Sequence, residues 1–192
     1  STAPADLSKV YVQPLDGDND TKTIPLRFKD GRYTANVPVS VSGFYELVMV
    51  INNGQWLATV YTPKSRKVEF DIEFDGTSLI ERSSVDNRAM SGLNSVVNAN
   101  NRKLWMSAGL SDAALRSLME NYMTACDSII AAENPSAAVT AYMRATAYAG
   151  AKNFYTSIPR AQKRKLKELP YTDADVLPSM SAVLDNEHAA LI

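Results

Sequence analysis

The chain has 192 residues, of which 45% are hydrophobic and 21% are charged, a composition typical of a globular protein that can bury a core. Its 20 basic and 21 acidic side chains nearly cancel, so the sequence lacks the net positive charge that favours binding to nucleic acid. The longest uninterrupted apolar run, Leu47 to Ile51, is far shorter than the roughly 20 residues that span a bilayer, so no transmembrane segment is expected.

The first part of the chain, from Val10 to about Asp75, has the two-residue hydrophobic period of β-strands. Asp30-Gly31 and Asn53-Gly54 each separate two extended runs, and such pairs favour type I′ turns because both central residues need positive φ. The sequence therefore predicts two β-hairpins in this part of the chain.

The clearest predicted strand runs from Val68 to Asp75, where apolar and acidic residues alternate. The segments 45–51 and 56–61 are apolar on both faces, which predicts central strands. These patterns together favour a small antiparallel meander or sandwich.

After Ser83-Ser84 the hydrophobic period changes to that of a helix, which predicts a β-rich domain over 1–83 and a helical domain over 84–192. We expect a first helix over 86–107 that stops at Gly109, and a second helix capped by Ser111. The apolar stripe of the second helix comprises Leu115, Leu118, Met119, Tyr122, Cys126 and Ile129.

Asn134-Pro135 resembles an N-cap followed by proline at the first helical position, so it predicts a third helix that runs to about Ala149. Shorter helices are expected near 160–168 and 178–190. The predicted fold class is therefore α+β, with an N-terminal antiparallel β meander or sandwich followed by a C-terminal helical bundle.

Two groups of carboxylates are candidate sites. The run Asp16–Asp20 resembles the start of a calcium loop, but Thr21 and Arg27 stand where an EF-hand needs glycine and glutamate, so a polar turn is the better interpretation. Glu69, Asp71, Glu73 and Asp75 share one face of the predicted 68–75 strand. They are interpreted as a solvated face that discourages edge pairing, with cation binding or acid-base catalysis as the alternative.

Three further features are interpreted as structural. The basic residues between Arg160 and Lys167 predict a solvated helix face, with phosphate or lipid headgroups as the alternative partner. His188, the only histidine, has no predicted catalytic or zinc-binding partners, and Cys126 lies on the apolar stripe, where a buried and inert thiol is expected. The sequence thus predicts no catalytic residue, no metal and no cofactor.

Trp56 and Trp105 are the candidate ligand or interface residues, because aromatic faces stack on sugars and on apolar peptide side chains. Trp56 begins a predicted strand and Trp105 ends a predicted helix. Core packing of both rings is the competing interpretation.

Several short segments carry a family resemblance, namely Phe-Lys-Asp-Gly-Arg-Tyr at 28–33, Gly-Phe-Tyr-Glu-Leu at 43–47, Val-Tyr-Thr-Pro at 60–63, Asp-Asn-Arg-Ala-Met at 86–90 and Ala-Val-Leu-Asp-Asn-Glu-His-Ala at 182–189. Their pattern of turns and spacings resembles the N-terminal region that precedes the thioredoxin-like domain of envelope thiol-disulfide oxidoreductases from anaerobic Gram-negative gut bacteria. In that family the catalytic CxxC lies in the downstream domain, and Cys126 matches no family motif.

The resemblance implies a non-catalytic accessory region of an exported thioredoxin-like protein. Such a region would position the thioredoxin-like domain, make it dimerise or deliver substrates to it. It also implies a periplasmic or envelope location, with a lipid anchor as one form of it, and a CxxC soon after Ile192 in a longer product. The alternative is a free-standing envelope module that binds a glycan or peptide. A third hypothesis is a hydrolase that uses the carboxylates of the 68–75 strand.

Overall fold

The computed structural model describes residues 7–15, 23–37, 42–51, 54–63, 67–76, 78–106, 111–147 and 149. The chain divides into two compact units, one ending at Gly92 and the other beginning at Leu93, and each is described by itself. The predicted acidic run at 16–20, the stop at Gly109, the helices near 160–168 and 178–190, the basic cluster and His188 lie outside the described residues.

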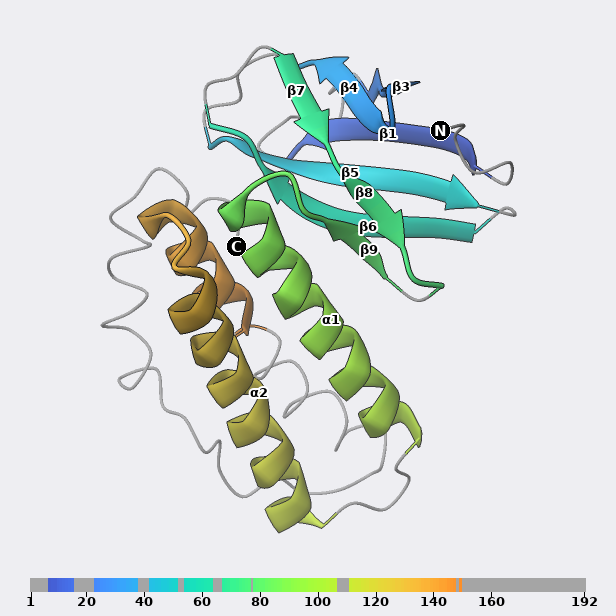
Figure 1. The fold of residues 1–192 in the computed structure, drawn as a ribbon. Helices are drawn as coiled ribbons and strands as arrows, with labels where there is room; N and C mark the ends of the chain where they lie inside the picture. The colour runs from blue at the N-terminus through green and yellow to red at the C-terminus, as the bar shows by residue number, and fades with distance from the viewer. Residues whose placement is uncertain are drawn as a thin grey trace. The chain divides into compact units, whose positions relative to one another are not determined.

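The largest sheet of the first unit is antiparallel and has four strands (Figure 1). Its order is β2-β1-β5-β6, in which the two central strands, β1 and β5, have eight residues each. The predicted central position of 56–61 is wrong within this sheet, because β6 is its last strand and exposes 53% of Leu57. The strands are β1 (Leu7–Pro14), β2 (Ile24–Pro25), β5 (Phe44–Ile51) and β6 (Gly54–Tyr61).

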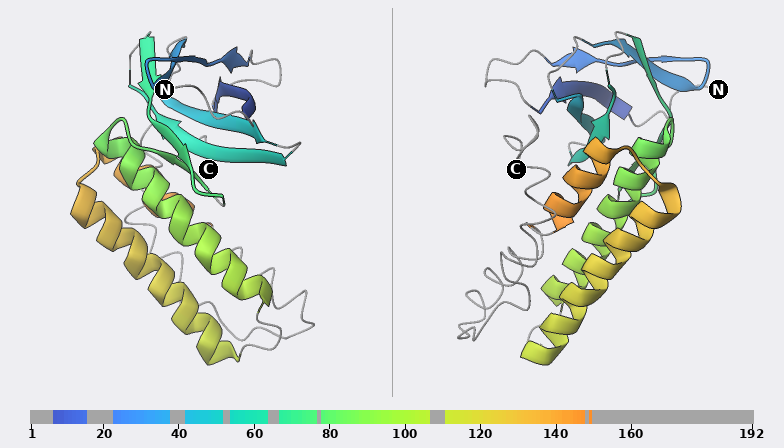
Figure 2. Two further views of the ribbon diagram at one scale, coloured as in Figure 1. Left: turned by 45° about the vertical axis from the view of Figure 1, so that its right-hand side comes forward. Right: turned by 90° about the vertical axis from the view of Figure 1, so that its left-hand side faces the viewer.

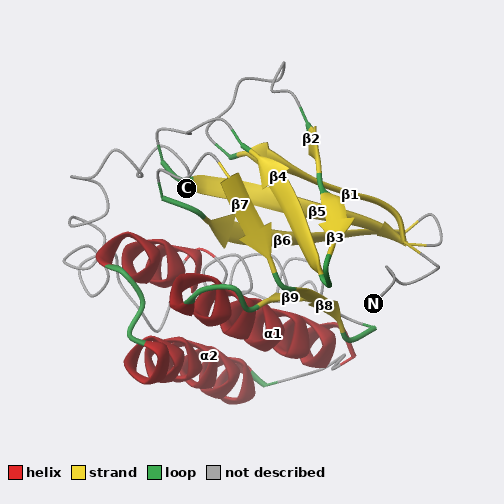
Figure 3. Cartoon of the chain, turned by 45° about the horizontal axis from the view of Figure 1, so that its top comes forward, coloured by secondary structure: helices red, strands yellow, loops and turns green. Residues whose placement is uncertain are grey.

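A second antiparallel sheet has the order β3-β4-β7, and β8 pairs with β9 in a third (Figure 3). The predicted single strand over 68–75 is interrupted at Asp71, so β7 and β8 belong to different sheets. The Asp71 N–H bonds to the side chain of Glu81 in place of a neighbouring strand. These strands are β3 (Arg27–Lys29), β4 (Arg32–Asn36), β7 (Lys67–Phe70), β8 (Ile72–Phe74) and β9 (Leu79–Glu81).

Both predicted hairpins are present. Asp30 and Gly31 have φ values of 51° and 84° between β3 and β4, as a type I′ turn requires. The β5–β6 hairpin differs in detail, since Gly54 pairs with Ile51 and so belongs to the strand. The predicted Asn-Gly pair is therefore not the whole turn, and residues 52–53 lie outside the described residues.

One hydrophobic core fills the first unit, and its residues come from all three sheets. The alternation predicted for β7 is confirmed, because Val68 and Phe70 are buried while Lys67 and Glu69 are exposed. The fully buried members of largest volume in this core are Tyr45, Phe70, Leu47, Met49, Leu79 and Val12.

Two long helices follow, α1 (Val85–Met106) and α2 (Asp112–Glu133), and a third helical segment covers 137–147. Ser111 caps α2 as predicted, with its side chain accepting from the Ala114 N–H at 3.3 Å. The predicted role of Asn134 is wrong: it has φ 49° and closes α2 as a left-handed C-cap. Ser136 caps the third segment instead, since its side-chain oxygen accepts from the Val139 N–H at 3.4 Å.

The second unit contains a helical hairpin of α2 and the 137–147 segment (Figure 2, yellow to orange). Cys126 and Asp127 of α2 contact Met143 and Arg144 of the segment, at 3.7 Å and 3.5 Å. The buried ones among the described residues of these two helical segments are Tyr122, Cys126, Val139, Met143, Ala145 and Ala147. The α+β class is confirmed. Within the described helices, no stretch has both the length and the hydropathy for crossing a bilayer.

Candidate functional site

The two tryptophans predicted as ligand or interface residues lie in different elements. Trp56, in β6, packs against the core of the first unit, and its ring meets that of Phe74 with centroids 4.8 Å apart and an interplanar angle of 55°. Trp56 as a whole is half-buried. Trp105 lies in α1, and its side chain is outside what the structure describes.

The four carboxylates of the predicted 68–75 strand do not form one array. All four are exposed, but Glu69 lies in β7 and Glu73 in β8, on opposite sides of the break at Asp71. Glu73 pairs with Arg82 at 2.9 Å, and the Asp75 side chain accepts from the backbone N–H of Ser78 at 2.8 Å.

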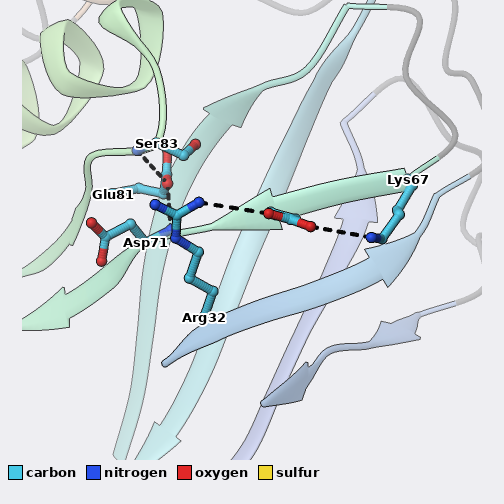
Figure 4. A network of polar contacts seen from close by, with 6 residues as sticks. Arg32, Lys67, Asp71, Glu81 and Ser83 are labelled. Carbon is cyan, nitrogen blue, oxygen red and sulfur yellow. Dashed lines mark hydrogen bonds and ion pairs between the residues drawn. The ribbon is translucent and has the colours of Figure 1, made fainter. Parts of the chain in front are cut away.

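Glu69 lies between two basic side chains, Lys67 at 3.2 Å and Arg32 at 3.6 Å (Figure 4). The hydrogen bond and the charge of Lys67, followed by Arg32, lower the pKa of Glu69. A general acid needs a raised pKa, so this carboxylate is poorly suited to that role.

The Cys126 thiol is buried in the helical hairpin and donates to the carbonyl oxygen of Met143 at 3.7 Å. Burial, with a contribution from the charge of Asp127, raises the pKa of Cys126 to about 11. A thiol must lose its proton to act as a nucleophile, and this environment opposes that loss. The structure thus agrees with the prediction of a buried thiol.

A buried carboxylate, that of Glu81, was missed by the sequence reasoning. Glu81 ends β9 and is 1% exposed. Its Oε1 accepts from the backbone N–H groups of Asp71, at 2.9 Å, and Ser83, at 2.8 Å (Figure 4). Among the described residues, no donor lies in hydrogen-bonding geometry with its other oxygen, Oε2.

The main chain of Glu81 is also tied to α1. The Glu81 N–H donates to Ser91 Oγ at 2.9 Å, and the Ser91 hydroxyl donates back to the Glu81 carbonyl at 3.2 Å. Burial is the leading influence on the carboxyl group and raises the pKa of Glu81. Hydrogen bonding from Ser83, the Asp71 backbone and Asn87 acts in the opposite direction without reversing the shift.

The first turn of α1 also bonds the end of β6, within the first unit, which is called the β unit below. Ser84 caps the helix by accepting from the Asn87 N–H at 3.1 Å. The Asn87 side chain, which is 3% exposed, accepts from the Tyr61 N–H at the end of β6, at 2.7 Å. Asn87 therefore holds the last residue of a strand to the start of a helix.

The alternation in β9 was the signal that could have revealed Glu81. Leu79 and Glu81 are buried on one face and Ile80 is less buried on the other, so a two-residue period places a carboxyl group inward. Among the described residues, no group of three or more His, Cys, Asp or Glu side chains could hold a metal ion. The carboxyl group of Glu81 therefore has a structural role, because it binds the backbone N–H groups of Asp71 and Ser83.

No family model matches the chain, and no curated protein or solved structure was found to be similar to it.

Proposed function

We propose that this chain is the non-catalytic accessory region of an exported thioredoxin-like protein, and that it positions, dimerises or delivers substrates to a domain that performs thiol-disulfide chemistry. The proposal rests on the resemblance of the turns at 28–33 and the segments at 43–47 and 86–90 to that family. It also places the protein in the periplasm or cell envelope.

One structural observation carries the proposal. The single cysteine, Cys126, is 1% exposed, bonded to the Met143 carbonyl, and has a raised pKa. Disulfide exchange requires an accessible thiolate, which this residue does not offer. A redox reaction in which this chain takes part would therefore use thiols supplied by another domain.

The coding sequence tests the proposal first. We expect the codons that follow Ile192 to encode a CxxC within a thioredoxin-like pattern, and a stop codon at that point would contradict this function. The longer product would then be compared with a version that lacks 1–192. The shortened protein should reduce a small disulfide at an unchanged rate but act more slowly on a protein disulfide or lose its dimeric state.

A variant of Cys126 tests whether this chain takes a direct part in the thiol-disulfide chemistry. Cys126→Ala in the longer product should leave both rates unchanged, because the thiol is buried and inert in this proposal. Equal rates and oligomeric states with and without 1–192 would contradict an accessory role.

The alternative, a module that binds a glycan or peptide, would use Trp56. The ring is partly engaged with Phe74 and the core, so only its remaining exposed part is left for a ligand. A shift of tryptophan fluorescence on adding a glycan or peptide, lost in Trp56→Phe but kept in Trp105→Phe, would favour this alternative.

A further inference from the structure

The strand break at Asp71 is held by the side chain of Glu81, the last residue of β9, which pairs with Ile72 of β8. Glu81 Oε1 accepts from the backbone N–H groups of Asp71 and Ser83, and this three-residue arrangement is called the Glu81 clasp below (Figure 4). The Arg82 N–H also donates to the Asp71 carbonyl at 3.0 Å. The clasp therefore joins the β7–β8 break to the segment between β9 and α1.

The clasp is buried yet incompletely bonded. Glu81 is 1% exposed, and Oε2 lacks a donor in hydrogen-bonding geometry among the described residues. The side chains of Ser83 and Asn87 lie close enough to lower the pKa of Glu81 in part, but burial outweighs their effect. An ionised carboxylate that is removed from water needs donors on both oxygens to offset its lost hydration. A protonated carboxyl group carries no net charge, so its unbonded oxygen costs much less free energy.

We propose that the Glu81 clasp is a proton-dependent latch: it is closed when Glu81 carries a proton on Oε2, and it loosens when the buried carboxyl group ionises. In the closed state Oε1 remains the acceptor for both N–H groups. When Glu81 ionises, hydration of Oε2 becomes favourable, and the hydrogen bonds from the Asp71 and Ser83 N–H groups break at the β7–β8 break. The latch thus couples the pH to the connection between β9 and α1.

The charged side chains around the clasp do not supply a counter-ion. The clasp includes the acidic Asp71, and the basic Arg82 follows Glu81 in the chain. Both side chains are exposed to solvent, and Arg82 is already paired with Glu73 on β8. On α1, Asp86 is half-buried and Arg88 is exposed.

The titratable Tyr61 on β6 presents its backbone N–H to Asn87, and burial, with Asp86 second, raises the pKa of its hydroxyl. Burial, not a neighbouring charge, is the leading influence on Glu81. The opening of the latch therefore does not require a neighbouring residue to change its charge.

The direction of the pH dependence follows from the raised pKa of Glu81. The closed state holds the proton more tightly than an opened, hydrated glutamate with the ordinary value of 4.5. The latch is therefore fully closed below 4.5, and its stability is lost as the pH rises towards the Glu81 midpoint of the folded protein. Above that midpoint the stability of the closed state no longer depends on pH, because Glu81 is then ionised in both states.

Two measurements on the unmodified full chain test the latch. The NMR shift of the Glu81 carboxyl carbon should titrate with a midpoint above 4.5. Hydrogen exchange of the Asp71 and Ser83 amides, corrected for its intrinsic pH dependence, should show an opening that grows about tenfold per pH unit up to that midpoint. A midpoint at or below 4.5, or an opening that does not change with pH, would overturn the proposal.

Variants identify the responsible group. Glu81→Gln keeps an acceptor at Oε1 and cannot ionise, so the amides of Asp71 and Ser83 should stay protected at every pH tested. The matched control is Glu73→Gln, which removes an exposed carboxylate on β8 and should keep the wild-type pH dependence. A Glu81→Gln protein that keeps that dependence would overturn the proposal, and if this variant does not fold, the titration of the unmodified chain decides alone.

Discussion

The β unit and the helical hairpin satisfy their buried polar groups in different ways. In the β unit, the side chains of Glu81 and Asn87 bond backbone groups at irregular points, namely the Asp71 break and the end of β6. In the hairpin, the helices bond their own backbone, and the buried side chains include the apolar Val139 and Met143. Irregular strand ends thus need buried polar residues, whereas helices need them only as caps.

The largest expected effect tests the apolar side of this comparison. Met143→Ala removes a fully buried side chain from the hairpin and should lower the free energy of unfolding by about 2–5 kcal/mol, because it leaves a cavity. Urea unfolding followed by circular dichroism would measure it. Met143→Leu, which conserves volume, should cost less than about 1.5 kcal/mol. A loss for Met143→Ala as small as that expected for Met143→Leu would contradict the cavity argument.

The next effect tests the polar side. Asn87→Ala leaves the Tyr61 N–H without its acceptor, and we expect a loss of about 1–3 kcal/mol. Hydrogen exchange at the Tyr61 amide should accelerate with it. The control is Asn121→Ala on the exposed face of α2, which should change the stability by less than about 0.5 kcal/mol. Unchanged exchange at Tyr61 would contradict the assigned role of Asn87.

A smaller effect is expected at a helix cap. Ser111→Ala removes the acceptor for the Ala114 N–H and should destabilise α2 by about 1 kcal/mol. Ser128→Ala, in the middle of the same helix, removes only a hydroxyl that bonds back to the Thr124 carbonyl, so it should be neutral or slightly stabilising. Thermal unfolding of the two variants would compare them, and equal costs would argue against capping.

The smallest effect concerns the surface of the β unit. Glu73→Gln breaks the ion pair with Arg82, in which both side chains are more than half exposed, so the loss should stay below about 1 kcal/mol. High salt should reduce it further. If urea unfolding showed a larger loss that salt did not reduce, this ion pair would contribute more to the stability of the β unit than an exposed pair should.

Local signals in the sequence were sufficient for the elements that depend on neighbouring residues. The turn at Asp30-Gly31 needs positive φ, and the cap at Ser111 needs an acceptor three residues before Ala114, so both could be predicted. Asn134 was assigned to the wrong helix because an asparagine before proline suits an N-cap and a left-handed C-cap alike.

Signals between distant residues were missed. Alternation over 68–75 continues through Asp71, so the sequence gives no sign that Glu81, ten residues away, takes its N–H and ends the strand. Asn87 and Tyr61 are 26 residues apart, and only the fold brings them together. The position of β6 at the end of its sheet likewise depends on the strand order, which local hydrophobicity does not encode.

The most direct test of the proposed function is the reactivity of Cys126 in the folded chain. A thiol with a pKa raised to about 11, buried against Met143, should not react with a water-soluble aromatic disulfide at neutral pH, yet should react fully once urea unfolds the protein. Rapid and complete reaction of the native protein would contradict the account, because the chain would then carry an accessible redox thiol of its own.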